Sequence, residues 1–172
     1  VDWMVVRGPA ALKAETLPES HRRILCVSPG FGDQARLDAA RQVITRFAER
    51  AFRRPVPPDE VDRILRIFRL ADDRGESFER SVQVALTTVL ASPQFLFLVE
   101  PEESREDRPL TEYELASRLS YFLWSSMPDD ALFDEARAGT LRGHLRQQVV
   151  RMLEDPKSNA FVENFAGQWL QL

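Results

Sequence analysis

The sequence is poor in the residues that build disulfides and metal sites. Its 172 residues include one cysteine, Cys26, and two histidines, His21 and His144. A single cysteine cannot form a disulfide within the chain, and neither a zinc-type Cys/His spacing nor the CxxCH motif for covalent haem attachment is present. A lone cysteine beside Val27 in a short apolar run is more typical of a packed residue than of a nucleophile. We therefore predict no metal site and no cofactor in this chain.

Long apolar runs are also missing. The longest candidate, 82–99, is interrupted by several polar residues and by Pro93. A membrane-spanning helix needs about 20 consecutive apolar residues, so we predict a soluble chain with no membrane span. The chain begins with Val1 and the helical pattern of 167–172 stops midway, and we interpret it as a fragment of a longer protein. In a fragment, the lack of a visible signal peptide says nothing about export.

Charge gives little indication of a partner. The formal net charge is −4, and almost all basic residues are arginine. Arginine suits phosphate contacts, but the arginines are not interleaved with aromatic residues and match no nucleic-acid-binding signature, so solvated helix faces explain them better. We predict no nucleic-acid binding. The content of 44% hydrophobic and 29% charged residues is sufficient for one sizeable core or two small ones.

The first 33 residues differ in pattern from the rest. Residues 1–6 are mainly β-branched or aromatic, which favours a short strand, and 24–27 could form a second strand. The turn-forming stretch 28–32 separates this segment from the remainder of the chain. Two strands do not make a stable sheet alone. We therefore predict that 1–33 is a β-type N-terminal arm, the remnant of an upstream β-sandwich.

From Asp33 onward, apolar residues recur every three or four positions, which is typical of amphipathic helices. In the first helix Arg53 is predicted to lie on the polar face. Proline and glycine separate about seven helices, and Thr111 with Glu114 forms the sequence pattern of a capping box. Acidic residues dominate 100–109, which we interpret as a linker. The sequence therefore predicts an all-α fold of two contiguous small helical bundles, 34–99 and 110–172. The residues expected to be buried in these bundles include Ala40, Val43, Ile44, Val61, Ile64, Leu65, Phe68, Val82, Ala85, Val89, Ala116, Phe122, Leu123, Leu132 and Met152.

Four stretches, taken in order, are similar to a known group of proteins. They are FAERAFRRP at 47–55, VLASPQFLF at 89–97, LASRLSYFLWSSMPD at 115–129 and VENFAGQWL at 162–170. This chain, over roughly 34–172, resembles two adjoining uncharacterised helical domains of the large exported multidomain proteins called planctomycete-type cytochrome c proteins.

The resemblance implies a context more than a chemistry. It implies an exported protein, periplasmic or extracellular, with a c-type haem domain elsewhere in the parent chain and a β-sandwich similar to carbohydrate-binding modules before the helices. It assigns no catalytic residue to the helical domains. Relatives often carry a second cysteine near 37–40, which this chain lacks, so the resemblance leaves Cys26 without a disulfide partner.

Five residues are candidates for ligand binding, and each has a structural alternative. Arg118 could meet an acidic ligand or could form a salt bridge with Glu114 or Asp129. Trp124 and Trp169 could provide a stacking platform for a sugar, but both occupy positions that their helices would bury. Asn164 could bind a substrate, although amides in helices more often bridge neighbouring elements. We predict no catalytic residue.

Two functions remain open. The first is a noncatalytic structural or interaction module that contacts other domains of the parent chain, with a link to polysaccharide handling. The second is a part of an oxidative or hydrolytic enzyme that acts on polysaccharide, with Arg118, Trp124, Asp129, Asn164 and Trp169 lining its cleft. Convergence of these five side chains on an open pocket would favour the second function.

Overall fold

The computed structural model describes residues 18–98 and 108–170, and within them every regular element is a helix. The predicted all-α fold is therefore confirmed. The strand predicted at 1–6 lies outside the described residues. The strand predicted at 24–27 is wrong, because helix α1 (Glu19–Ile24) ends there and an irregular stretch comes after it.

The described residues divide into two compact units. The N-terminal unit comprises 18–47 and 57–89, and the C-terminal unit comprises 48–56, 90–98 and 108–170. The unit boundaries cut helix α2 (Asp33–Phe52) after Phe47 and helix α4 (Phe78–Leu90) after Val89. The last turn of α2 therefore belongs with the later helices.

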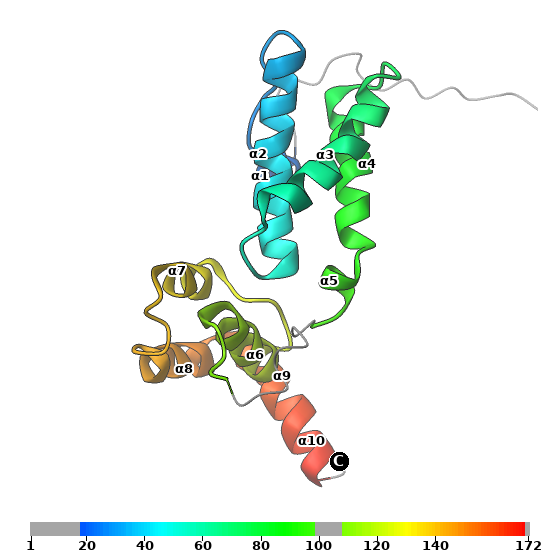
Figure 1. The fold of residues 1–172 in the computed structure, drawn as a ribbon. Coiled ribbons are helices and arrows are strands. Elements are labelled where there is room, and N and C mark those ends of the chain that lie inside the picture. Colours follow the sequence, from blue (N-terminus) through cyan, green and yellow to red (C-terminus); the bar gives the residue numbers. More distant parts are fainter. Residues whose placement is uncertain (1–17, 99–107, 171–172) are drawn as a thin grey trace, which may run out of the picture. The chain divides into compact units, whose positions relative to one another are not determined.

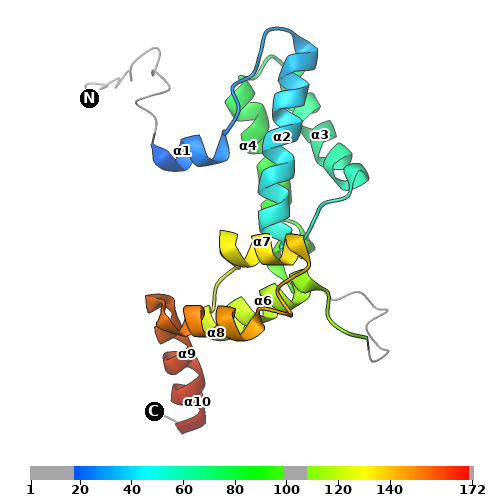
Figure 2. The ribbon, with the colours of Figure 1, turned by 90° about the vertical axis from the view of Figure 1, so that its left-hand side faces the viewer.

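The N-terminal unit is built on α2, α3 (Pro58–Asp72) and α4, which lie side by side (Figures 1 and 2). Their predicted apolar stripes are buried, which confirms the helical pattern. The Phe68 and Phe78 rings meet edge to face at 5.8 Å between centroids. An ion pair between Arg41 and Asp62, with 2.6 Å from nitrogen to oxygen, joins α2 to α3 at the surface.

The C-terminal unit begins with the short helix α5 (Pro93–Leu96) and continues with α6 (Glu112–Trp124), α7 (Asp130–Ala138) and α8 (Leu145–Glu154). A 3-10 turn (Pro156–Ser158), α9 (Asn159–Phe161), a π-helical turn (Val162–Ala166) and α10 (Gly167–Leu170) complete the described chain. Figure 1 shows α9 beside α6, with α10 running on toward the C terminus. The core of this unit is formed by Ala116, Leu123, Trp124, Leu132, Ala136, Leu141 and Met152.

Local sequence signals fix the ends of α6 and α7. The predicted capping box is present: Thr111 Oγ1 accepts from the Glu114 amide at 3.2 Å, and Glu114 Oε2 accepts from the Thr111 amide at 2.7 Å. The side chain of Asp129 caps α7 by accepting from the Leu132 amide at 3.0 Å. Gly139 ends α7 with φ of 70°, a left-handed conformation that favours glycine.

The predicted burial of Phe122 is wrong. The helical pattern places Phe122 inward with Leu123, but the Phe122 side chain is 58% exposed. Its ring instead packs edge to face on Phe161 of α9, with 5.1 Å between centroids. The ring gains an aromatic contact at the surface because α9 lies beside that face of α6.

Neither a membrane-crossing helix nor a metal-binding cluster is found in the described part of the chain. Over 18–98 and 108–170, none of the helices combines the length and apolarity that a membrane crossing requires. The same residues hold no group of three or more histidine, cysteine, aspartate or glutamate side chains that could bind a metal ion.

Candidate functional site

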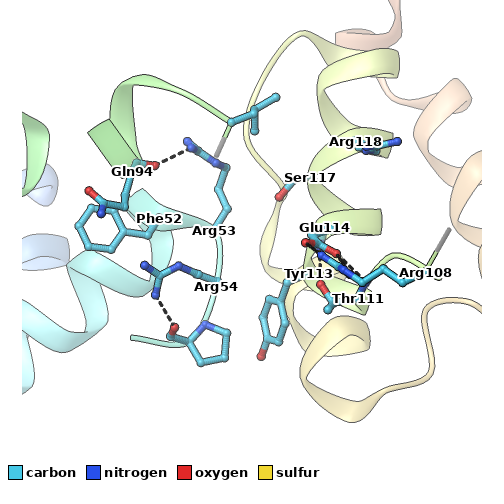
Figure 3. Close-up of a pocket in the computed structure, with 12 residues that line it drawn as sticks. Phe52, Arg53, Arg54, Gln94, Arg108, Thr111, Tyr113, Glu114, Ser117 and Arg118 are labelled. Atoms are coloured by element: carbon cyan, nitrogen blue, oxygen red, sulfur yellow. Dashed lines mark hydrogen bonds and ion pairs between the residues drawn. The ribbon is translucent and has the colours of Figure 1, made fainter. Parts of the chain in front are cut away.

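The C-terminal unit contains a cavity of about 470 Å³. One wall is the chain that leaves α2, with Arg53 and Arg54, together with Gln94 of α5, and the other is the start of α6 (Figure 3). On the α6 wall, Figure 3 shows Ser117 facing the first wall and Glu114 beside Arg108 and Thr111. Segments that are far apart in the sequence therefore enclose the same space.

Arg53 organises the first wall. It comes directly after the last residue of α2 with φ of 58°, a left-handed conformation that turns its side chain away from the helical path, and it is only 7% exposed. Its guanidinium donates to the carbonyl oxygens of Gln94 at 2.8 Å and Phe97 at 3.0 Å. It also lies 5.8 Å from the centroid of the Tyr121 ring. These contacts hold the end of α5 against the end of α2.

The α6 wall carries a fixed negative charge. Arg108 donates twice to the Glu114 carboxylate, from Nη1 to Oε2 at 3.0 Å and from Nη2 to Oε1 at 2.7 Å. This side-chain hydrogen bonding, together with the smaller effect of the contacts with Thr111, lowers the pKa of Glu114 to about 2. Glu114 is therefore ionised at neutral pH and its charge is paired with Arg108.

The cavity lining combines guanidinium groups with apolar surface. Among the described residues that line it, the charged groups are those of Arg53, Arg54, Arg108, Arg118 and Glu114. Apolar surface comes from Phe52, Pro55, Leu98 and the ring of Tyr113. A space of this size with an apolar lining and a few polar groups is typical of a small-molecule site.

The five predicted ligand-binding residues do not converge on this cavity. Of the five, Arg118 alone lines it. Trp124 is 3% exposed and its indole N–H donates to the Met152 carbonyl at 2.9 Å, which is the packed position considered as the alternative to ligand binding. Trp169 is 76% exposed, which contradicts the predicted burial, and the reason is that α10 extends beyond the core helices.

Asp129 and Asn164 serve contacts between elements. The Asp129 carboxylate accepts from Arg151 at 2.7 and 3.2 Å, which joins the start of α7 to α8. Burial favours a raised pKa for Asp129, but the hydrogen bonds from Arg151 and the Leu132 amide outweigh it, and the pKa is lowered. The Asn164 amide donates to Ser125 Oγ at 2.8 Å and so joins the π-helical turn to the end of α6.

The carboxylates suggested as partners of Arg118 are both bound by other arginines, Glu114 by Arg108 and Asp129 by Arg151. A separate polar cluster closes the loop between α7 and α8. In it, His144 lies at the start of α8, with its Nδ1 2.9 Å from Glu135 Oε2. Hydrogen bonds from Thr140 and then His144 lower the pKa of Glu135.

An exposed row of aromatic rings runs from α6 to α10. We call Phe122, Phe161, Phe165 and Trp169 the aromatic row. Phe161 and Phe165 stack with 5.1 Å between centroids and 8° between ring planes, and Phe165 and Trp169 stack at 6.4 Å and 28°. Phe122 meets both phenylalanines edge to face. Trp169, Phe122 and Phe165 are at least half exposed, so the row forms an apolar strip at the surface.

The helical pattern misses the role of Arg53, which it places on the polar face of the first helix. A signal is present in the sequence: Pro55 and Pro57 restrict the residues before them, so the helix must end early and Arg53 need not continue its face. The hydrogen bond from Arg53 to the Gln94 carbonyl joins residues 41 positions apart, so neighbouring residues in the sequence do not predict it.

Comparisons with known families identify two adjoining domains. Residues 39–100 match the family model PSD5, described as a protein of unknown function (DUF1595). Residues 110–172 match PSD4, described as a protein of unknown function (DUF1592). No curated protein and no solved structure matches the chain. The two matched segments contribute opposite walls of the cavity, with Arg53 and Gln94 from the first and Glu114 and Arg118 from the second.

Proposed function

We propose that the chain is a noncatalytic interaction module of a larger exported, cytochrome-associated protein, and that its aromatic row packs against another domain of the same parent chain. The carrying observation is the exposure of that row. Most of the large apolar side chains that are exposed in the described residues belong to the C-terminal unit. Extended apolar surface of this kind marks interaction sites on folded proteins.

The geometry of the row favours a protein partner over a sugar. Phe161 stacks on Phe165 and Phe165 on Trp169, so much of the area of their ring faces is used within the row. A sugar stacks on a ring face, whereas aliphatic and aromatic side chains pack well against ring edges. The proposed link to polysaccharide handling therefore rests on Trp169, the most exposed ring of the row.

The polar side chains support a structural role. Trp124, Asp129 and Asn164 each use their hydrogen-bonding groups on a neighbouring element of the same unit. Such contacts keep the helices in register and leave the aromatic row on a rigid support. In this proposal the c-type haem belongs to another domain of the parent protein, which can be checked by the absorption spectrum of covalent haem in the purified parent. Export is checked by cell fractionation.

The experiment measures association between this chain and the remaining domains of the parent protein, supplied as a separate polypeptide. We expect Phe165→Ser to weaken the association at least tenfold, because it removes a ring from the middle of the row. Leu70→Ser is the matched control, since Leu70 is an exposed apolar residue of α3 in the other unit. Equal weakening of the association by both variants would contradict the proposed role of the aromatic row.

The proposal that the module is noncatalytic has a separate test. Polysaccharide turnover by the parent protein should be the same in the wild type and in Arg118→Gln. A loss of turnover with unchanged folding would instead support the second function, in which these helices form part of an enzyme.

A further inference from the structure

The charged side chains of the cavity are already partnered within the protein. Arg53 donates from both terminal nitrogens to backbone carbonyl oxygens. Arg108 pairs with the Glu114 carboxylate, and neither Arg54 nor Arg118 is without a partner. Among the described lining residues, the charges therefore give an ionic ligand no advantage over a neutral one.

Ser117 offers an unused hydrogen-bonding group to the cavity. The residue lies on α6 and is only 7% exposed, and Figure 3 shows its side chain facing the other wall. Its backbone carbonyl accepts from the Ser120 hydroxyl at 3.1 Å, but within the described part of the chain its own hydroxyl has no hydrogen-bond partner. Because a buried hydroxyl is more stable with a partner, a ligand group that hydrogen-bonds with it would be favoured.

The rest of the described lining favours a flat apolar body. Phe52 and Pro55 lie on the first wall and Tyr113 on the α6 wall, so rings line both sides of the space. Leu98 adds aliphatic surface, and all of these residues belong to the C-terminal unit. Aromatic ligands pack well against such rings. The volume of about 470 Å³ is within the range of roughly 300–1,000 Å³ that small-molecule sites occupy.

We propose that this cavity binds a small neutral organic molecule that carries an aromatic ring and a hydroxyl group. The ring lies against the apolar residues of the two walls, and the ligand hydroxyl bonds with Ser117 Oγ. A serine hydroxyl both donates and accepts, so an alcohol can pair with it in either direction. This binding requires no reaction and is independent of the aromatic row.

The test is a titration of the isotopically labelled 172-residue chain, monitored through the backbone amide resonances. The probe is benzyl alcohol. Toluene has the same ring without the hydroxyl and reports the apolar contacts alone, whereas sodium benzoate carries a charged carboxylate. We expect saturable shifts at Phe52, Arg53 and the first two turns of α6 with benzyl alcohol and with toluene, and no tighter binding of benzoate than of benzyl alcohol.

Two serine variants separate the hydroxyl from the apolar contacts. Ser117→Ala removes the hydroxyl and changes the volume of the lining little. It should weaken the binding of benzyl alcohol about fivefold, which corresponds to one hydrogen bond, and leave the binding of toluene within twofold of the wild type. Ser81→Ala is the matched control, because Ser81 of α4 is also buried with an unpartnered hydroxyl but lies in the N-terminal unit, outside the lining. It should leave the binding of both probes within twofold, and circular dichroism checks that both variants are folded.

Three results would overturn the proposal. They are the absence of saturable shifts with benzyl alcohol or with toluene, tighter binding of benzoate than of benzyl alcohol, and equal effects of Ser117→Ala and Ser81→Ala on the binding of benzyl alcohol. None of these results bears on the aromatic row, whose test is association with other domains.

Discussion

Replacing each of two tryptophans by phenylalanine compares a buried ring with an exposed one in the same unit. In Trp124→Phe, the Met152 carbonyl loses its 2.9 Å hydrogen bond from the indole. Leaving a buried carbonyl without a donor costs about 1–2 kcal/mol. The smaller ring also leaves a void of roughly 40 Å³, which at about 24 cal/mol per Å³ adds about 1 kcal/mol. We expect a total loss of about 2–3 kcal/mol in the free energy of unfolding.

Trp169→Phe is the matched control. Trp169 is 76% exposed and stacks on Phe165, and phenylalanine can keep that stacking. We expect a change below about 0.5 kcal/mol. The assay is urea unfolding monitored by far-ultraviolet circular dichroism, because both variants alter tryptophan fluorescence. Equal costs for the two variants, or a negligible cost for Trp124→Phe, would refute the assignment of Trp124 to the core and of Trp169 to the surface.

Three further predictions concern the helix ends. Thr111→Ala should lower the free energy of unfolding by about 1 kcal/mol because it removes the cap of α6, whereas Thr87→Ala on the exposed face of α4 should change it little; thermal melts compare them. Glu114 has a pKa of about 2 against an ordinary 4.5, so its stabilising charge is fully present above pH 4.5 and is lost as the pH falls toward 2. The stability difference between wild type and Glu114→Gln should therefore shrink over that range in urea titrations, and a constant difference would contradict the Arg108 contact. Gly139→Ala should cost about 1 kcal/mol because φ there is 70°, whereas Gly143→Ala, where φ is not positive, should be nearly neutral in the same melts.

Much of the fold could be predicted from the sequence because it depends on local patterns. The stripe of Val61, Ile64, Leu65 and Phe68 repeats with the helical period and is buried as expected. The capping box at Thr111 needs only residues three positions apart, and it forms. Proline and glycine mark the helix ends because their backbone preferences act on adjacent residues.

The candidate site could not be predicted in the same way. Its walls meet through contacts between residues that are far apart in the sequence, such as Arg53 with Gln94 and with Tyr121. Helical periodicity predicts which face of a helix is apolar but not which neighbour covers it. This is why the pattern predicts burial for Phe122 and Trp169, both on apolar faces, although both are exposed.

Because both matched segments line the cavity, each depends on the other to complete it. Its first wall lies within residues 39–100 and most of its second wall within 110–172, which are the segments that match the two families. Separating the two segments would part Arg53 from Tyr121, whose ring lies 5.8 Å from the guanidinium. A polypeptide that contains only one of the two segments would therefore lack one wall of the cavity.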